Sequence, residues 1–360
     1  MVKKIKVILV DDNASVRKLL KNFLSKELDI EIVAEAADPF DASEKIEQFE
    51  PDVMILDIEM PRMNGLEFLK QLMPQLPMRV IMFSGIDDNA AKIALTSMDY
   101  GAIDFITKPD GSADAFENTA LELISKIRFS MGVNLDEWIH TREKNVKLIA
   151  NKKFNSNVQT PYSSSAVTRY RMIAIGASTG GTHAIRQIIS DLPTDFPGIV
   201  IVQHMPPGFT KIFSERLNEQ FPVQVKEAQD GDQIRPGLVL IAPGDFHMVV
   251  LKSGLNLIVR IKHGEKVNGH KPSVDVLFNS IVDAGLSRQT IGCILTGMGA
   301  DGAIGLTNMR RQGSRTLGQT KESCVVYGMP KVAYDMGGVD EQVGLKDFVW
   351  KIKTILYEKA

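Results

Sequence analysis

One stretch of the sequence decides the fold: Met172-Ile173-Ala174-Ile175-Gly176-Ala177-Ser178-Thr179-Gly180-Gly181. An apolar run leads into a serine flanked by glycines, and a helical pattern follows at residues 184–189. This order predicts a strand, a sharp turn and a helix, with the Ser178 hydroxyl at the turn. The first amides of such a helix point toward whatever the serine attacks. The motif fits a nucleophilic serine. It also fits a plain tight turn or a phosphate-binding loop, although the spacing is not G-x-G-x-x-G.

A nucleophilic serine needs a base, and the base needs a carboxylate that orients it. His204 follows the apolar run 199–203, and Asp301 follows the run 291–295 after a glycine-rich stretch. All three residues come just beyond the C-terminal ends of predicted parallel strands, where open α/β sheets bind ligands. We therefore predict a catalytic set of Ser178, His204 and Asp301. Its order along the chain differs from the Ser…Asp…His order of α/β-hydrolases.

The other histidines lack this placement at the end of a strand. They lie in a hairpin-like segment, in a glycine-rich polar loop, between the two halves of the chain, or in the first turn after the serine: His247, His263, His270, His140 and His183. His247 is expected to be structural or to lie at the rim of the site. His183 is expected to point along its own helix, so His204 is the predicted base.

The composition is typical of a globular protein with two domains. The chain has 360 residues, of which 44% are hydrophobic and 24% charged, enough for two cores of ordinary size. A formal net charge of −2 gives no general attraction to nucleic acid. The apolar run at residues 5–10 is too short for a signal peptide or a membrane span, which predicts no membrane insertion. Cys293 and Cys324 lack metal-ligand spacing and favour a reducing cytoplasm.

Strand and helix patterns alternate in both halves of the chain. In the first half, strands are expected at residues 5–10, 30–34, 53–56, 80–83 and 103–106, and helices at 16–24, 41–48, 65–72, 90–98 and 113–127. The alternation predicts the α/β class, with two doubly wound, mainly parallel sheets. The domains are expected at residues 1–128 and 170–360. Residues 129–169 break the rhythm and are interpreted as a linker with a short helix near 135–139.

Polar residues follow the expected strands of the first half. Asp11 and Asp12 follow the first strand, Asp57 follows the third, Ser84 ends the fourth and Lys108 follows the fifth. These side chains should gather at one edge of the sheet. Three carboxylates form an oxygen-rich site suited to Mg²⁺. Asp57 can then be a nucleophile toward a phosphoryl group whose charge Lys108 neutralises.

This half resembles the response-regulator receiver domain, which has a flavodoxin-like fold, over almost all of residues 4–128. The resemblance implies that Asp57 is phosphorylated and that a CheA-type histidine kinase is the phosphodonor. It implies that Ser84 bonds the phosphoryl group, that Lys108 senses it and that Phe105 is the aromatic switch. The residues implied to bind Mg²⁺ are Asp11, Asp12, Asp57 and, through its backbone carbonyl, Glu59.

The second half resembles the Rossmann-like catalytic domain of chemotaxis protein-glutamate methylesterases, the CheB family, over residues 170–357. The segments that carry the resemblance are 175–181, 203–205, 241–244, 270–278, 295–303 and 327–330. With a receiver in front of them, they resemble the family over the whole chain. Asn13 and the pair Thr182-His183 depart from the family's pattern without removing a catalytic group, and they leave the choice of substrate open.

The resemblance implies a phosphorylation-regulated serine hydrolase that demethylates glutamate methyl esters on the cytoplasmic helices of a chemoreceptor. Ser178 would attack the ester, His204 would move the proton and Asp301 would hold the imidazole. The N–H of Met298 is implied to stabilise the oxyanion. Thr179 is a candidate to position His204 or simply to cap the helix. Selected receptor glutamines would be deamidated by the same chemistry.

Two other functions stay open at this point, a regulated binding protein without turnover and a hydrolase of small esters. The presence of all three catalytic candidates favours an enzyme. An apolar rim for the substrate is expected from Met205, Pro206, Pro207 and Phe209, with a core role for Met205 equally expected. An unphosphorylated receiver is expected to cover the serine site until phosphorylation of Asp57 weakens that docking.

Overall fold

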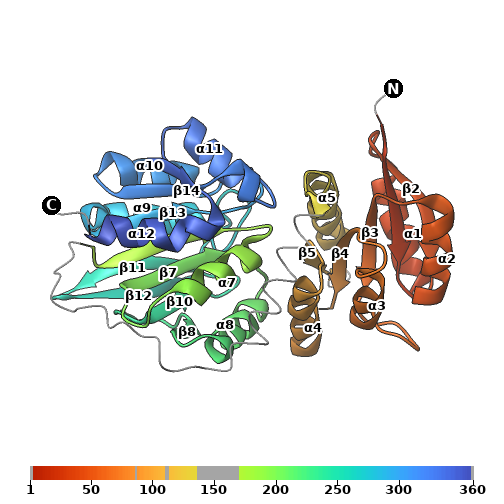
Figure 1. Ribbon diagram of the computed structural model, residues 1–360, viewed down its shortest axis with the longest axis horizontal. Coiled ribbons are helices and arrows are strands. Elements are labelled where there is room, and N and C mark those ends of the chain that lie inside the picture. Colours follow the sequence, from red (N-terminus) through yellow and green to blue (C-terminus); the bar gives the residue numbers. More distant parts are fainter. Residues whose placement is uncertain (1–2, 86, 110–112, 136–169, 358–360) are drawn as a thin grey trace. The chain divides into compact units, whose positions relative to one another are not determined.

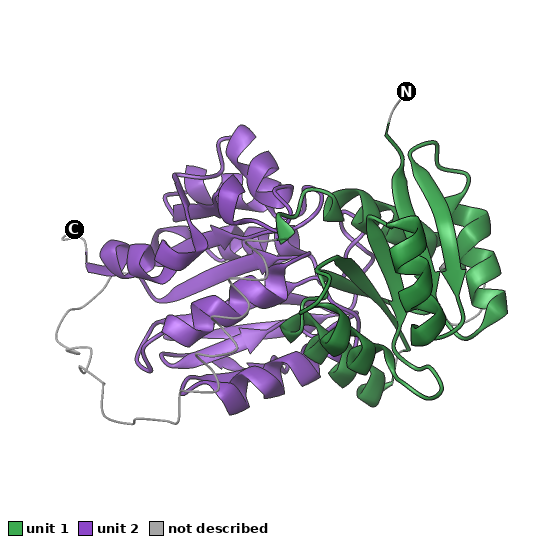
Figure 2. Ribbon diagram, turned by 45° about the vertical axis from the view of Figure 1, so that its right-hand side comes forward, with its two compact units in different colours: residues 1–153 green, residues 154–360 purple. Residues whose placement is uncertain are grey.

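The chain forms two compact units, residues 1–153 and 154–360 (Figure 2). The structure is a computed structural model that describes residues 3–85, 87–109, 113–135 and 170–357. Most of the expected linker, including nearly all of its expected short helix, lies outside the described residues. None of the described helices is both long and apolar enough to cross a membrane.

The first unit contains a parallel sheet with the strand order β2-β1-β3-β4-β5. Its strands are β1 (Ile5–Val10), β2 (Ile30–Ala36), β3 (Val53–Asp57), β4 (Arg79–Ser84) and β5 (Asp104–Thr107). Its helices are α1 (Ala14–Leu24), α2 (Pro39–Phe49), α3 (Gly65–Leu72), α4 (Asp88–Asp99) and α5 (Ala113–Ser130). All the expected elements are confirmed, with shifts of a few residues at their ends. The central strand β3 is buried along its whole length because helices cover both faces of the sheet (Figure 1).

Short polar side chains begin the helices of this unit. Each accepts a hydrogen bond from a backbone N–H of the first turn, which would otherwise lack a partner. The capping residues of α1, α2, α3 and α4 are Asn13, Asp38, Asn64 and Asp87. The departure at Asn13 therefore has a structural explanation, because its side chain accepts from the N–H groups of Ser15 and Val16.

The second unit contains a larger parallel sheet with the order β15-β14-β13-β6-β7-β10-β8. Its strands are β6 (Met172–Ala177), β7 (Gly198–Gln203), β8 (Gln224–Glu227), β10 (Leu238–Ile241), β13 (Thr290–Ile294), β14 (Arg315–Gln319) and β15 (Glu341–Val343). An antiparallel sheet of β9 (Gln233–Ile234), β11 (His247–Ser253) and β12 (Asn256–Lys262) includes the expected hairpin. Two mainly parallel α/β sheets are thus confirmed.

Strand β6 lies where the winding of this sheet changes direction. From β6 the chain moves to β7 on one side, and from β13, on the other side of β6, it moves away to β14 and β15. Opposite directions put the connecting helices on opposite faces (Figure 1). The helices of this unit are α7 (Gly181–Asp191), α8 (Phe209–Gln220), α9 (Val274–Asp283), α10 (Ala303–Arg311), α11 (Met329–Asp335) and α12 (Phe348–Tyr357), of which α12 follows the last strand. Such a switch point is the usual ligand site of an open α/β sheet.

Candidate active site and phosphoacceptor site

Ser178 and His204 are neighbours because their strands are neighbours. β6 and β7 pair in parallel with Ala177 opposite Gln203, so the next residue of each chain lies at the same edge of the sheet. The N–H of His204 donates to the Ala177 carbonyl at 3.1 Å, and the N–H of Ser178 donates to the Thr296 carbonyl at 3.0 Å. The strand register therefore brings the predicted nucleophile and the predicted base together.

Asp301 lies in the loop between β13 and α10 and contacts His204. Its side chain is almost fully buried, and its Oδ2 lies 2.8 Å from His204 Nε2. Oδ1 accepts from the Ser273 hydroxyl at 2.8 Å, and Oδ2 accepts from the Val274 N–H at 2.7 Å, at the N-terminus of α9. Burial alone would raise the pKa of Asp301, but hydrogen bonds from His204, Asn268 and Val274 lower it well below its usual range. Asp301 is therefore ionised and able to stabilise an imidazolium.

The second ring nitrogen of His204, Nδ1, is buried and has no hydrogen-bond partner among the described residues. Because Asp301 occupies Nε2, Nδ1 is the atom that can take a proton from Ser178. Within the described part of the chain neither Ser178 nor Thr179 bonds to Nδ1. Such bonds often tighten only when substrate is bound. Gly180, not Thr179, is the N-cap of α7, so the capping role expected of Thr179 is wrong. Its role in positioning His204 stays a prediction.

The peptide that joins Gly297 to Met298 has a fixed orientation. Its carbonyl, on Gly297, accepts from the N–H groups of Gly328 at 3.1 Å and Met329 at 2.8 Å. In a trans peptide the N–H points away from the carbonyl, so the Met298 N–H faces away from those two residues. A Cβ added at Gly297 would lie 2.8 Å from the Cβ of Ser178, so this peptide packs against the predicted nucleophile. These contacts favour the oxyanion role expected of the Met298 N–H.

Gln203, which the sequence reasoning missed, holds the backbones of both predicted catalytic residues. Its Nε2 donates to the Ser178 carbonyl at 2.9 Å and to the His204 carbonyl at 3.1 Å. The side chain is buried, and a Cβ at Gly181 would collide with its Oε1, so this position needs glycine. The sequence did contain a signal, which is a glutamine at the end of an apolar strand. Buried amide side chains normally have hydrogen-bond partners, so a glutamine at this position indicates partners nearby.

His270 lies in the polar loop where it was expected, but the sequence did not indicate its contact with His204. Its ring stacks on that of His204, with centroids 3.7 Å apart and planes inclined by 10°. His247 is structural, as expected. Its Nδ1 accepts from the Ser273 N–H at 3.3 Å, and its Nε2 donates to the Glu265 carbonyl at 2.9 Å.

His183 is a poor alternative base. It lies in the first turn of α7, and burial, aided by the positive charge of Arg186, lowers its pKa to about 4. Its imidazole is therefore neutral near pH 7 and too weak a base to compete with an ordinary histidine for a serine proton.

The expected apolar rim is only partly present. Pro207 is exposed and Pro206 is half-buried. Met205 is buried, in agreement with its alternative core role, and Phe209 is fully buried as the first residue of α8. The inclusion of Phe209 in a contact surface was therefore wrong, because its side chain belongs to the core.

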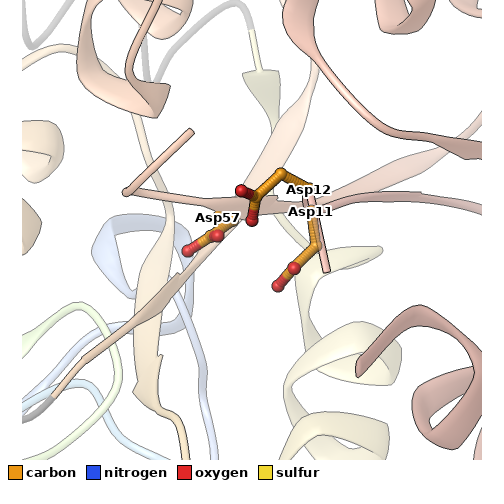
Figure 3. Close-up of side chains that lie close together, drawn as sticks. All are labelled: Asp11, Asp12 and Asp57. Carbon is orange, nitrogen blue, oxygen red and sulfur yellow. The ribbon is translucent and has the colours of Figure 1, made fainter. Parts of the chain in front are cut away.

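Three carboxylates gather at the C-terminal edge of the first sheet (Figure 3). One oxygen from each of Asp11, Asp12 and Asp57 lies within 4.8 Å of the others. Asp57 Oδ2 is buried and has no hydrogen-bond partner among the described residues, so it is an acceptor left for a cation. A set of carboxylate oxygens fits Mg²⁺. The N–H of Glu59 donates to Asp57 Oδ1 at 3.3 Å, which brings the loop of Glu59 to the same site.

Lys108 contacts this acidic group from the end of β5. Its Nζ lies 2.8 Å from Asp57 Oδ1 and 3.0 Å from Asp11 Oδ2. Burial and the charge of Asp11 raise the pKa of Asp57 to about 6, although Lys108 opposes the rise. The pKa of Lys108 is itself raised, because the two carboxylates outweigh its burial. The site thus holds one lysine against two buried acids and favours a further cation.

Ser84 is the last residue of β4 and Phe105 lies on β5, and both are buried. The Ser84 hydroxyl donates to the Gly85 carbonyl at 3.1 Å, and the Ser84 carbonyl accepts from the Lys108 N–H at 2.6 Å. Lys126 donates to the Phe105 carbonyl at 2.7 Å. Ser84 is therefore joined to the acidic group through Lys108, whereas the described contact of Phe105 leads to Lys126. The switch roles of both residues stay predictions.

The raised pKa of Asp57 predicts a stabilising substitution. The pKa of the Asp57 carboxyl is about 6 in the folded protein and 3.8 in the unfolded chain, so the folded state binds the proton more tightly. The stability that this proton contributes is lost as the pH rises through 6, and above that pH the buried charge costs stability. Asp57→Asn should therefore raise the stability of the first unit by roughly 1–3 kcal/mol at pH 7.5 without Mg²⁺. The gain should shrink near pH 4.5. The measurement is the melting temperature of the full chain at both pH values.

The matched control for that experiment is Glu47→Gln, which removes an exposed carboxylate from α2. It should leave the free energy of unfolding within about 0.5 kcal/mol of the wild type, and the melting temperature nearly unchanged, at both pH values. Equal melting of Asp57→Asn and wild type at pH 7.5 would show that Asp57 carries no buried, destabilising charge.

Comparisons with known proteins agree with this geometry. The family described as CheB methylesterase matches residues 173–352, and the family described as response regulator receiver domain matches residues 7–118. The chain is 45% identical to a protein-glutamate methylesterase/protein-glutamine glutaminase of Syntrophotalea carbinolica, over 100% of this chain and 99% of the relative. It is 46% identical to a protein of the same name from Yersinia pestis bv. Antiqua (strain Antiqua), over 95% of this chain and 94% of the relative.

A solved structure matches the second unit. The catalytic domain of the CheB methylesterase of Thermotoga maritima is 37% identical, with a TM-score of 0.50. The match covers 52% of this chain and 98% of the solved one. With a receiver domain ahead of a methylesterase domain, and with a relative that matches it over its full length, the chain belongs to the CheB methylesterase family.

Proposed function

We propose that this protein is a phosphorylation-regulated protein-glutamate methylesterase of chemotaxis, and that Ser178, His204 and Asp301 catalyse its reaction. The observation that carries the proposal is the buried 2.8 Å contact of His204 with Asp301, one strand away from the serine turn. The name shared by the relatives supports the substrate class. The substrate is a glutamate methyl ester on the cytoplasmic helices of a chemoreceptor.

The first half of the reaction forms an acyl-enzyme. Ser178 Oγ attacks the ester carbonyl while its proton passes to His204 Nδ1, and Asp301 stabilises the imidazolium through Nε2. The N–H of Met298 faces the developing oxyanion. The tetrahedral intermediate collapses, the bond to the methoxy oxygen breaks, and His204 returns the proton to give methanol.

The second half releases glutamate. Water attacks the acyl carbonyl and gives a proton to His204, which passes it to Ser178 Oγ as the acyl bond breaks. One water is consumed for each ester cleaved, and the enzyme is restored. A glutamine side chain would follow the same path with ammonia as the leaving group, which accounts for deamidation as a second activity.

The first unit supplies the regulation. Asp57 accepts a phosphoryl group from a CheA-type histidine kinase, Lys108 neutralises the added charge, and Ser84 and Phe105 respond to it. Asp11, Asp12, Asp57 and the backbone carbonyl of Glu59 would hold Mg²⁺. The bound cation supplies charge neutralisation for phosphoryl transfer.

A cytoplasmic location suits the two cysteines. Both are free thiols, and burial raises the pKa of Cys293 and of Cys324 far above the ordinary value. Both thiols are therefore protonated near neutral pH, as expected in a reducing compartment.

Methanol release from a methylated chemoreceptor cytoplasmic domain tests this function. We expect release by the full chain, faster with Mg²⁺ and a phosphodonor than without them. A free small ester at matched concentration should be hydrolysed far more slowly. Equal rates on both would instead indicate a hydrolase of small esters, and no release from either would indicate a binding protein.

If the unphosphorylated receiver covers the serine site, removal of the receiver should raise activity. A chain starting at Ser165 should release methanol faster than the unphosphorylated full chain, because nothing then covers the serine site. The related domain from Thermotoga maritima was solved by itself, which supports independent folding of this part. Asp57→Asn should keep the basal rate and ignore acetyl phosphate. A truncated chain slower than the full chain would mean that the phosphorylated receiver activates the esterase directly.

A further inference from the structure

Two aspartates cap each other's helices behind His204. Asp301 lies just before α10, yet its carboxylate accepts N–H groups at the start of α9, from Val274 at 2.7 Å and from Asp275 at 3.2 Å. Asp275 is the second residue of α9, yet its Oδ1 accepts the N–H of Gly305 in α10 at 2.7 Å. Both carboxylates are buried, and both benefit from the positive end of a helix.

Asn268 joins these two carboxylates. Its Nδ2 donates to Asp275 Oδ2 at 2.7 Å and to Asp301 Oδ1 at 2.9 Å. The residue lies in a tight turn closed by paired backbone hydrogen bonds between Val267 and His270, and it has a φ of 52°. Asparagine tolerates this left-handed conformation better than most residues, and the turn directs its amide to the carboxylates. One neutral amide thus separates two acids.

We propose that Asn268 and Asp275 are positioning residues of the methylesterase reaction, which hold the Asp301 carboxylate in the orientation and charge state that His204 requires. The hydrogen bonds described for the two residues reach Asp301 and not His204, so both act through Asp301. This inference rests on the proposed function, but it adds residues that the reaction scheme does not include.

The pKa shifts agree with this arrangement. Burial and the charge of Asp301 raise the pKa of Asp275, against hydrogen bonds from Gly305 and Asn268. The hydrogen bonds described for the Asp275 carboxylate are all accepted from N–H groups, as expected of its ionised form. Asp275 is therefore a second negative charge close to the triad, with Asn268 reducing its repulsion of Asp301.

Few other titratable groups face His204. His270 stacks on its ring, and Asp301 bonds to Nε2. His247 lies behind the start of α9 and bonds to Ser273. Lys271, next to His270, pairs with Asp245 at 3.1 Å. Changes at residues 268 and 275 leave all these groups in place, so a shift in the titration of His204 reports on the two carboxylates.

The experiment compares Asp275→Asn with Asn268→Gly in the full chain. Asp275→Asn removes a negative charge, which should make His204 easier to deprotonate and move the acid limb of kcat/KM to lower pH by roughly 0.5–1 unit. Asn268→Gly removes the donor that screens both carboxylates and should move the limb to higher pH. Glycine is chosen because it accepts a positive φ without strain. Both variants should lose about tenfold in kcat with little change in KM.

Asn279→Ala is the matched control. Asn279 accepts a hydrogen bond from Asn308 at 2.9 Å and so joins α9 to α10 without contacting either carboxylate. It should lower the melting temperature but leave the acid limb in place. If all three variants merely lower kcat by a similar factor without moving the limb, Asn268 and Asp275 serve only to hold the two helices together, and the proposal is wrong.

NMR titration of the His204 ring gives a readout that does not depend on turnover. Resonances are assigned with His204→Gln, and the midpoint should fall in Asp275→Asn and rise in Asn268→Gly. Absent or equal shifts would overturn the proposal even if methanol is released. Opposite shifts in a protein that releases no methanol would support the positioning network and reject the proposed function. Residue 268 is exposed and glycine fits its positive φ, so Asn268→Gly should fold, and this half of the test survives if Asp275→Asn fails to fold.

Discussion

Replacement of Ser178 by alanine is expected to lower methanol release by about 10⁴–10⁶-fold in a protein that stays folded. The hydroxyl is the only group removed, and it is the nucleophile of the proposed reaction. The bonds that shape the turn come from the backbone: the Ser178 N–H donates to Thr296, and the Ser178 carbonyl accepts from Gly181 and Gln203. None of them needs the side chain, so the melting temperature should hardly change.

Ser190→Ala is the matched control, because Ser190 lies on the helix that follows the turn and its hydroxyl only bonds locally, to Gln187 and Asp191. It should keep the full rate. The assay is methanol release from methylated receptor domain under phosphodonor. A rate for Ser178→Ala within tenfold of wild type would remove Ser178 from the mechanism, whatever the position of His204 and Asp301.

The second large effect is expected from replacement of His204. The informative result is that the rate losses from changing Ser178 and His204 should not combine in the double variant. His204→Ala should cost about as much as Ser178→Ala, since the serine cannot lose its proton without a base. The double variant should then be hardly slower than either single variant, because the residues act as a unit. Rates are measured on the same receptor substrate at saturating and at low concentrations.

His263→Ala controls for the loss of an imidazole, because His263 is exposed and contacts the ring of Phe246 rather than the triad. It should retain activity. Multiplicative losses in the Ser178/His204 double variant would mean that His204 acts elsewhere, and His270, stacked on its ring, would be the first alternative to test.

Asp301→Asn is expected to reduce turnover about 10⁴-fold, as loss of the orienting carboxylate does in other triads. The structure adds a cost that the sequence alone did not suggest. An amide would put an NH₂ group in place of one carboxylate oxygen. That group would face either the N–H of Val274, which now donates to Oδ2, or the Ser273 hydroxyl, which now donates to Oδ1. This variant should therefore also melt at a lower temperature, unlike Ser178→Ala.

The sequence predicted the features that depend on local pattern. Runs of apolar residues gave the strands, and the residue after each run gave Ser178, His204 and Asp57, because parallel strands end at a common edge. These inferences need only the period of the pattern and the chemistry at its end.

The features that were missed depend on contacts between distant segments. Asn268 and His270 lie in a polar loop, and nothing local says that their turn folds back onto Asp301 and His204. Phe209 was misplaced because an apolar residue near a site is read equally well as rim or as core until its packing is known. Gln203 was visible as a polar end to a buried strand, but its two carbonyl partners follow from strand pairing.

The exchange of caps between α9 and α10 also bears on how related sequences should be compared. Asp301 is needed twice, once by His204 and once by the N-terminal amides of α9, whereas the Ser178 hydroxyl is needed only for chemistry. A descendant that loses its activity would be free to change the serine early, but it would keep the aspartate for as long as it keeps this fold. In a diverged homologue, a retained aspartate at this position therefore indicates only that the fold is kept. Retention of the serine and the histidine indicates that catalysis is kept.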